Sequence, residues 1–397
     1  MLIKQLRKLK KKILLFIAFI AAEKKWEFPK KNKILIADDV GSKKLSECIL
    51  GHSNFTILHT RQELYYFPIL LISLTKFFKY GFKSYSIAFI KYVNPNLVIT
   101  FIDNNISIPK IMSNFNDCKF VMIMNGRRHK TFLDEYNNLK KYKIDKYFVF
   151  GEDFKNEVKN KIPNTVVSGS IIANSLFNIT GFNKVKKVQY MSLWQKGYYD
   201  KNNKLLKELR DLDNTFYQPT TKYTLEIIKE FCQQNSLALE IIPRTTSKFE
   251  EKYYAEMIDS FTYKKRPDNE DSIYHSYRQL SDDAFAVGCT TTFLMECFGI
   301  GYRTGFLTFR QHIIPQDHLE NFRYVQWSWP KNTNDYGFFW SNVKEKKYIF
   351  NVLDNLLKVN ESDWKKIILP FKYGLMHHDP GNKIIKNYLK SLKIEVN

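Results

Sequence analysis

The chain has 397 residues and a formal net charge of +22, from 62 lysines and arginines against 40 aspartates and glutamates. This length exceeds the usual size of one hydrophobic core and predicts two domains. Hydrophobic residues make up 44% of the chain, which excludes an intrinsically disordered protein. The charge indicates a polyanionic partner, such as nucleic acid, an anionic membrane or a phosphorylated substrate, although a lysine-rich compositional bias would give the same excess.

The cysteines are scattered and lack the spacing of a metal site. They are Cys48, Cys118, Cys232, Cys289 and Cys297, with no CxxC pair among them. This pattern predicts neither a zinc site nor a disulfide framework, and it fits a reducing cytosol. We expect all of them to be buried small apolar residues.

Residues 1–30 form a basic N-terminal segment. Lys4, Arg7 and several further lysines precede the apolar run 13–22. The run is too short to span a bilayer as a helix. It is similar to the start of a signal peptide, but Glu23, Lys24 and Lys25 follow at once, and the first predicted strand begins shortly afterwards at residue 33. We therefore expect a basic amphipathic helix that packs on the first domain or lies on the inner leaflet of a membrane.

Short apolar strands alternate with helical stretches through residues 31–183, the first predicted domain. The predicted strands are 33–37, 55–59, 97–102, 120–124, 147–150 and 166–167. Five of them are followed by Gly, Asp, Asn or Ser and then by a helical stretch, whereas 55–59 is followed by Thr60 and Arg61. This is the pattern of a doubly wound parallel sheet. The segment 64–93 predicts two helices broken near Gly81, and its large apolar share predicts that it is buried.

A lysine-rich linker at about 180–187 leads into a second predicted domain, residues 184–360. Its predicted strands are 188–193, 237–242, 284–287 and one at Phe306, and its predicted helices are 220–235, 272–281, 293–298 and 343–359. Residues 361–397 predict terminal helices that pack back on the first domain. The expected fold class is α/β, with two Rossmann-like domains facing a cleft in the GT-B manner.

Ligands of such sheets lie outside the carboxyl ends of the strands, so the residues there are candidate site residues. The stretch 281–305 runs from a strand through three threonines into a helix that carries Glu296. Threonines at a helix start either cap its free N–H groups or leave them to a phosphate, which the helix dipole also favours. An ordinary strand and helix with a solvated Glu296 is the alternative, and the pattern does not separate the two.

Several blocks along the chain, in order, resemble one family. They are ILIADDVGS at 34–42, LHTRQELYYFPIL at 58–70, YVNPNLVITFIDNN at 92–105, FVMIMNGRR at 120–128, DKYFVFGEDF at 145–154, VSGSIIANS at 167–175 and the stretch 281–305. Together they resemble the bacterial surface-carbohydrate biosynthesis proteins that include the retaining β-Kdo transferases, which are GT-B-like enzymes using CMP-Kdo. The resemblance implies transfer of Kdo, or of a related 2-keto sugar acid such as a nonulosonic acid, from CMP to a lipopolysaccharide or capsule glycan.

A CMP-activated keto acid carries a phosphodiester and a carboxylate, so its site needs positive charge and backbone N–H groups. The candidate donor-binding residues are Arg244, Thr245, Thr290, Thr291, Thr292 and Glu296. Arg244 follows a predicted strand and is a candidate for the phosphate, against the alternative of an exposed loop arginine. The threonines are candidate donors to the same phosphate, and Glu296 is a candidate acceptor from ribose or cytidine hydroxyls.

The first domain supplies candidates for the sugar carboxylate or the acceptor. They are Asn104, Asn125, Gly126 and Arg127, of which the last three resemble the Asn-Gly-x-Arg block of the family. Arg127 can reach a carboxylate of the substrate, and the alternative is that it pairs with Asp134 or Glu135.

Asp103 ends a fully apolar strand, where an isolated carboxylate is costly unless it is hydrogen-bonded or functional. It is the candidate acid/base that deprotonates the acceptor hydroxyl, against the alternative that it only caps the next helix. Retention would need a carboxylate nucleophile or a front-face route. By the precedent of the family, an aspartate ahead of the Arg244 strand is the nucleophile, and Asp211 and Asp213 are the candidates.

No metal and no cofactor other than the CMP-sugar are expected, because arginine and helix amides can neutralise the leaving phosphate. We expect the protein in the cytoplasm, peripheral at an anionic inner-membrane surface. A nucleotide-sugar epimerase of GT-B fold is the alternative activity. A nucleic-acid-binding protein is less favoured, because the aromatic residues lie in apolar periodic segments rather than in a basic recognition motif.

Overall fold

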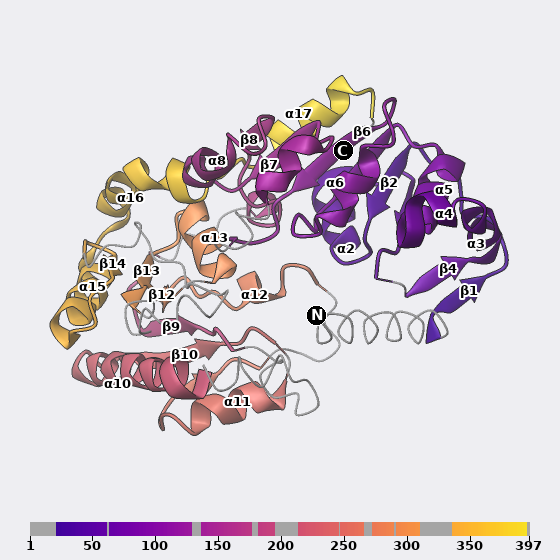
Figure 1. Ribbon diagram of the computed structural model, residues 1–397. Helices are drawn as coiled ribbons and strands as arrows, with labels where there is room; N and C mark the ends of the chain where they lie inside the picture. Colours follow the sequence, from indigo (N-terminus) through magenta and orange to yellow (C-terminus); the bar gives the residue numbers. More distant parts are fainter. Residues whose placement is uncertain are drawn as a thin grey trace.

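The computed structural model describes residues 21–61, 63–128, 136–176, 182–194, 213–245, 247–265, 272–289, 291–309 and 336–394. These residues form two lobes, each built on a six-stranded sheet (Figure 1). The chain crosses back at its C-terminal end, where the last helices run from the second lobe to the first. The predicted α/β class with two Rossmann-like sheets is confirmed.

The sheet of the N-terminal lobe has the order β3-β2-β5-β6-β7-β8, and its strand pairs are parallel. The strands are β2 (Ile34–Ala37), β3 (Phe55–Leu58), β5 (Leu97–Thr100), β6 (Lys119–Ile123), β7 (Lys146–Val149) and β8 (Thr165–Val167). The helices and short turns between them are α2 (Ser42–Leu45), η1 (Ser46–Leu50), α5 (Ser84–Val93), α6 (Ser107–Met112), η3 (Tyr136–Lys141), α8 (Glu152–Val158) and η4 (Ala173–Ser175). Strands β2 and β5 are buried along their whole length, which explains their unbroken apolar sequences.

The outer end of this lobe differs from the sequence prediction. Here β1 (Glu23–Lys25) pairs in parallel with β4 (Leu64–Tyr66), followed by α3 (Phe67–Leu74), α4 (Phe77–Tyr80) and η2 (Gly81–Lys83). The predicted N-terminal helix over 1–30 is therefore wrong for Glu23–Lys25, and residues 1–20 lie outside the described residues. The difference arises because β4 has backbone N–H and C=O groups along its edge, and residues 23–25 form hydrogen bonds with them as a parallel strand.

The predicted burial of the segment 64–93 holds for only part of it. Most residues of helix α5 are buried, whereas α3 and α4 leave several large apolar side chains exposed. Among the described residues, helix α3 packs on α5 and β4, and its other side faces the outer surface of the lobe.

The sheet of the C-terminal lobe has the order β11-β10-β9-β12-β13-β14, again with parallel pairs. The strands are β9 (Lys187–Met191), β10 (Ala238–Ile242), β11 (Thr262–Tyr263), β12 (Ala284–Gly288), β13 (Thr304–Leu307) and β14 (Trp340–Ser341). The helices are η6 (Asp213–Tyr217), α10 (Gln218–Gln234), α11 (Lys248–Ala255), α12 (His275–Arg278), α13 (Thr292–Ile300) and α15 (Lys346–Lys358). Because the chain starts in the middle of the sheet and turns outward on both sides, the order reverses between β9 and β12, which is where ligands of such sheets bind.

The C-terminal helices join the two lobes. Helix α16 (Glu361–Leu375) packs on α13 of one lobe and on α8 of the other. Helix α17 (Lys383–Ser391) buries Ile385 and Leu389 in the core of the N-terminal lobe. Between them, the Asn382 amide donates to the Ile171 carbonyl at 2.9 Å. The loop after β8 is thereby held against the returning chain. Among the described residues, no helix has both the length and the apolar character needed to cross a bilayer.

Gly169 is required at this junction for two reasons. Its φ of +77° is a left-handed value, and a Cβ added there would lie 2.1 Å from the His377 carbonyl oxygen of the returning chain. Gly381 has a similar φ of +79° but nothing within 4 Å of its added Cβ. An alanine at Gly381 would therefore suffer backbone strain alone, whereas an alanine at Gly169 would suffer both strain and a steric clash.

We expect Gly381→Ala to lower the free energy of unfolding by about 1–2 kcal/mol, the usual cost of a left-handed non-glycine residue. Gly169→Ala should cost clearly more, because the carbonyl of the returning chain must also move. Urea denaturation of both variants measures the difference. Equal losses would show that the close approach at Gly169 does not hold the junction.

Candidate functional site

The carboxyl ends of β9 and β12 adjoin at the point where the strand order reverses. Strand β12 ends at Gly288, where an added Cβ would lie 3.3 Å from both Cβ and the carbonyl oxygen of Met191, the last residue of β9. The absence of a side chain at Gly288 lets the two strand ends approach closely. The turn that follows carries the threonines into α13.

Thr291 caps α13. Its Oγ1 accepts a hydrogen bond from the Leu294 backbone N–H at 3.0 Å. The N–H groups of the first helical turn ahead of Leu294 have no acceptor within the helix, and the helix dipole gives this end partial positive charge. The structure thus shows a capped helix for Thr291, and the two N–H groups before Leu294 can still bind an anion. Thr290 lies outside the described residues.

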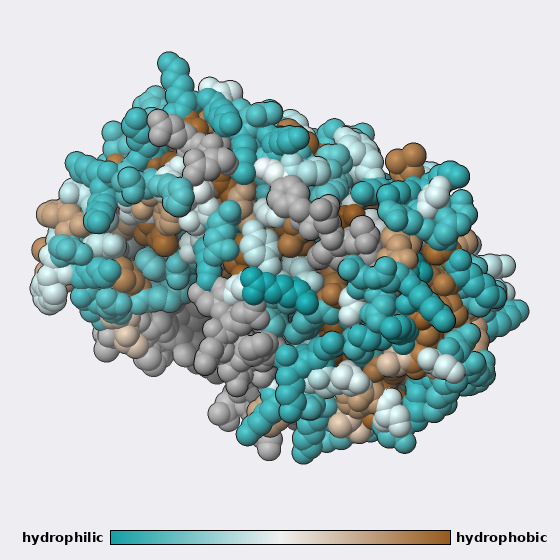
Figure 2. Space-filling view, turned by 180° about the vertical axis from the view of Figure 1, so that it is seen from behind, coloured by the Kyte–Doolittle hydropathy of each residue, from teal (hydrophilic) through white to brown (hydrophobic). Residues whose placement is uncertain are grey.

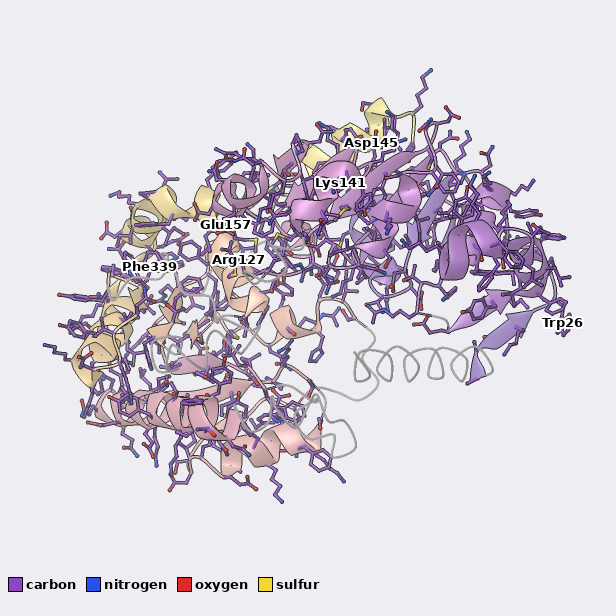
Figure 3. The ribbon with its side chains drawn as sticks, viewed as in Figure 1. Trp26, Arg127, Lys141, Asp145, Glu157 and Phe339 are labelled. Carbon is purple, nitrogen blue, oxygen red and sulfur yellow. The ribbon has the colours of Figure 1, made fainter. Side chains whose placement is uncertain are left out.

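The loop after β6 in the N-terminal lobe reaches the same helix start. A Cβ added at Gly126 would lie 3.3 Å from Thr292 Oγ1. Figure 3 shows Arg127 where the two lobes meet, beside Glu157 of α8. Arg127 Nη2 lies 2.7 Å from Glu157 Oε1. Asp134 and Glu135, which the sequence offered as its partners, lie outside the described residues.

A buried ion pair between Asp103 and Arg128 holds the loop after β6 in place. The carboxylate of Asp103 is fully buried. Its Oδ2 accepts a hydrogen bond from Arg128 Nε at 3.0 Å, and its Oδ1 accepts a second one from Arg128 Nη2. The Tyr147 hydroxyl donates to the same carboxylate at 2.6 Å. Burial first, and then the charge of Asp103, raise the pKa of Tyr147 well above its usual range, so the hydroxyl keeps its proton. Because a buried carboxylate needs such partners, Asp103 fixes the place of Arg128.

The same carboxylate also orders the backbone of the loop. The Asn125 N–H points to Asp103 Oδ1 at 3.4 Å, and Asn125 Oδ1 accepts from Arg128 Nη2. Helix α6 begins at Ser107 and its N-cap residue is Ile106, so Asp103 does not cap that helix. Arg127 is among the residues predicted from the sequence, and Arg128 is not. The available signal was the cost of burying Asp103, which requires a cation within reach.

Glu296 connects the two lobes one turn further along α13. Only 7% of its surface is exposed, and its carboxylate accepts from the Ser170 hydroxyl in the loop after β8. Burial raises the pKa of Glu296, and the hydrogen bond from Ser170 partly opposes this rise. The alternative of a solvated glutamate is therefore wrong.

A third buried carboxylate orders the loop after β10. Glu250 Oε1 accepts from the Arg244 N–H at 2.8 Å, and its Oε2 accepts from the Thr245 N–H at 2.9 Å and from Thr245 Oγ1 at 2.7 Å. Ser192, directly after β9, also donates to Glu250. The Arg244 side chain itself is exposed. Strand β9 separates β10 from β12, so Arg244 lies on the same sheet edge as the threonine turn, about 10 Å across two strand spacings.

The structure gathers most of the predicted residues, but not all. Those at the meeting of the lobes are Asp103, Asn125, Gly126, Arg127, Thr291, Thr292 and Glu296. Arg244 and Thr245 stand apart on the sheet edge, and Asn104 is exposed beside Asp103. Asp211 lies outside the described residues. Asp213 begins η6, and its side chain is likewise outside them.

Comparisons with known proteins bear on the family and on the fold. The profile of a family described as "putative O-antigen biosynthesis protein" matches residues 121–393, more than half of the chain. No curated protein sequence matches the chain.

Three solved structures are similar to the chain. UDP-GlcNAc 2-epimerase from Neisseria meningitidis, bound to UDP-GlcNAc, has a TM-score of 0.50 and 12% identity, covering 90% of this chain and 99% of the epimerase. A Listeria monocytogenes structure described as "putative UDP-N-acetylglucosamine 2-epimerase" has a TM-score of 0.51 and 9% identity, with 91% and 97% covered. A glycosyltransferase from Rickettsia africae has a TM-score of 0.47 and 13% identity, with 91% and 98% covered. The likeness to the first two shows the fold, two Rossmann-like domains of the GT-B kind.

We expect Asp103→Ala to lower the free energy of unfolding by about 3–5 kcal/mol, because it leaves Arg128 buried without its counter-charge. Asp354→Ala, which breaks an exposed pair with Lys358 on α15, is the control and should cost less than about 1 kcal/mol. Urea denaturation measures both. A similar small loss for the two variants would mean that Asp103 does not hold the loop.

Glu296→Gln should change how stability depends on pH. The folded pKa of Glu296 lies above its ordinary value of 4.5, so the folded state holds this proton to higher pH than the unfolded chain does. Its contribution to stability is complete below the unfolded pKa and is lost as the pH rises through the folded pKa. Denaturation at a series of pH values should show this loss in the wild type and a flatter profile in Glu296→Gln. The exposed Glu226→Gln on α10 is the control, and a Glu296→Gln profile parallel to the wild type would contradict the assignment.

Proposed function

Because the chain belongs to the family of O-antigen biosynthesis proteins whose profile it matches over residues 121–393, we propose that it is a glycosyltransferase of surface-carbohydrate biosynthesis. Its donor is a CMP-activated 2-keto sugar acid, Kdo or a nonulosonic acid, and its acceptor is a lipopolysaccharide or capsule glycan. The donor follows from the chemistry that the site offers to anions and from the resemblance of the sequence blocks to the retaining β-Kdo transferases.

One observation carries the proposal. The start of α13, with N–H groups that have no acceptor within the helix, meets the Asn-Gly-Arg loop of the other lobe at Gly126. A helix start binds phosphate through its amides and its dipole. Arginine binds carboxylates, and Arg127, which is paired with Glu157, would exchange that partner for the carboxylate of the sugar. A CMP-linked keto acid carries both anionic groups, so it matches a site that is shared between the two lobes.

The proposed roles follow the position of each residue. Thr292 and the first amides of α13 bind the phosphate, and Arg244 reaches it from the neighbouring strand end. Asn125, Gly126 and Arg127 contact the sugar carboxylate or the acceptor, together with Asn104. The prediction that Glu296 accepts from ribose or cytidine hydroxyls stays open, since its carboxylate is bonded to Ser170.

Transfer breaks the bond between the anomeric carbon and the phosphate oxygen, and CMP leaves with the electron pair. The acceptor hydroxyl forms the new bond and gives up its proton to a base. Asp103 as that base stays a prediction, and its ion pair with Arg128 supports a positioning role for the loop instead. For a retaining reaction, Asp211 or Asp213 is the proposed nucleophile. We propose no metal, because Arg244 and helix amides supply positive charge at the phosphate.

A nucleotide-sugar epimerase is the second candidate. Two of the similar structures carry the description of UDP-GlcNAc 2-epimerases, and they share the fold over nearly their whole length. An epimerase would prefer a uridine nucleotide and would need no acceptor. We further propose a peripheral location at the cytoplasmic face of the inner membrane, where the lipid-linked acceptors of such glycans are assembled.

We expect CMP to raise the melting temperature of the protein, and UDP and GDP to leave it nearly unchanged, because the proposed donor is a cytidine nucleotide. Thermal shift measures this, and turnover of CMP-Kdo or a CMP-nonulosonic acid with glycan acceptors identifies the sugar. Stabilisation by UDP alone, with interconversion of a UDP-sugar, would replace the transferase by the epimerase.

Arg244→Ala should weaken CMP binding by about tenfold or more, the usual effect of removing a charge-assisted hydrogen bond. Lys252→Ala, which removes an exposed cation from α11 of the same lobe, is the matched control and should bind CMP like the wild type. Isothermal titration measures both affinities. If Arg244→Ala binds CMP as tightly as the control, Arg244 has no part in the phosphate site.

A further inference from the structure

The outer end of the N-terminal lobe exposes large apolar side chains on consecutive turns. We call this surface, formed by α3 and α4, the apolar edge. Its exposed residues, with the exposed fraction of each, are Leu71 52%, Ile72 36%, Leu74 63%, Phe77 43% and Phe78 101%. It lies at the end of the lobe farthest from the C-terminal lobe (Figure 1). In the view from behind, brown atoms lie among teal ones along this outer side of the molecule (Figure 2).

The sequence of α3 explains why this surface is left open. The helix reads FPILLISL and is apolar on all sides rather than along one stripe. Ile69 packs into the core, whereas Leu71 and Leu74 point away from it. A helix that is apolar all round needs apolar surroundings on every side. Trp26 extends the surface from β1, with its ring 4.4 Å from that of Phe67 and 74% of its own surface exposed.

Lysines lie around the apolar edge, and those of α4 and the turn after it have no acidic neighbours in the sequence. Residues 64–102 contain no aspartate or glutamate, and within them Lys76, Lys79 and Lys83 lie on or directly after α4. Lys79 Nζ lies 5.2 Å from the centre of the Tyr80 ring, and Lys25 Nζ lies 5.9 Å from that of Tyr66. Lysine beside tyrosine and tryptophan, around exposed leucine and phenylalanine, is the composition of a surface that lies in a membrane interface.

We propose that the apolar edge is the surface by which this protein binds an anionic lipid membrane. Leu74 and Phe78 enter the boundary between headgroups and acyl chains, and Lys76 and Lys79 contact anionic headgroups. A second copy of the chain fits less well, because a contact through this surface would bring the lysines of both copies together. The sequence adds a second basic and apolar stretch at 4–20, and the chain enters the structure directly before β1, beside the apolar edge.

This inference deepens the peripheral location in the proposed function, but it stands on surface residues and not on the donor site. Two membrane signals are needed for stable attachment, since a single apolar or basic element gives only weak, reversible binding. The edge combines both kinds of signal on one folded surface.

The test is sedimentation with vesicles of phosphatidylcholine alone or mixed with phosphatidylglycerol. We expect the full chain to bind the mixed vesicles, and Leu74→Ser with Phe78→Ser to lower the partition coefficient by about tenfold or more. Leu369→Ser with Tyr373→Ser is the matched control, because these residues are 72% and 51% exposed on α16 at the other side of the molecule. The control should bind like the wild type.

The lysines are tested separately. Lys76→Gln with Lys79→Gln should lower binding to the mixed vesicles by roughly fivefold per lysine and leave binding to pure phosphatidylcholine unchanged. Thermal shift with CMP on the same variants keeps the two proposals apart. Edge-dependent vesicle binding without any CMP effect would overturn the proposed donor and leave the membrane surface standing.

Three results would overturn the membrane surface. Wild-type binding by the Leu74 and Phe78 double variant is the first. The second is that the double variant binds vesicles like the wild type but has a different oligomeric state, as measured by light scattering. The apolar edge would then be a contact between copies of the chain. The third is that a chain lacking residues 2–20 loses all vesicle binding while the edge variants lose none, which would assign binding to the N-terminal segment alone.

Discussion

A carboxylate withdrawn from water must find hydrogen-bond donors or a cation, and this constraint orders loops at the strand ends of both lobes. Asp103 takes Arg128 and the Asn125 N–H from the loop after β6. Glu250 takes the N–H groups of the loop after β10 and the Ser192 hydroxyl after β9. In each lobe, loop backbone N–H groups donate hydrogen bonds to a buried carboxylate. These bonds fix the conformation of the loop that follows the strand.

Glu296 is a buried carboxylate whose hydrogen-bond donor, Ser170, comes from the other lobe and carries no charge. Asp103 has an arginine, so its charge is balanced inside the N-terminal lobe, whereas Glu296 is bonded to the neutral Ser170 hydroxyl. Burial raises the pKa of Glu296, and the hydrogen bond from a neutral hydroxyl opposes this rise only in part. The helix whose first turn meets Gly126 is thus tied to the opposite lobe through a neutral donor, while α16 packs on helices of both lobes.

The sequence predicts the sheets well because a parallel strand covered on both faces must be apolar throughout and must end in a polar turn. It also places the threonine turn correctly, since the end of β12 falls where the strand order reverses. It fails at β1 and β4, whose short strands depend on pairing with each other and carry no periodic pattern. It fails again at Arg128, because two adjacent arginines have the same local sequence and only the fold decides which one faces Asp103.

The apolar content of α3 and α4 predicts burial, and the structure shows exposure. The prediction and the structure agree if a membrane covers that surface. An apolar sequence indicates that the side chains need apolar surroundings, but it does not say whether protein or lipid provides them. The distribution of charge points the same way. At the meeting of the lobes Arg127 is paired with Glu157 and Arg128 with Asp103, so these two arginines contribute little to the net charge of +22. Lys76, Lys79 and Lys83 stand in a stretch without acids, and there the basic excess can act on an extended anionic surface.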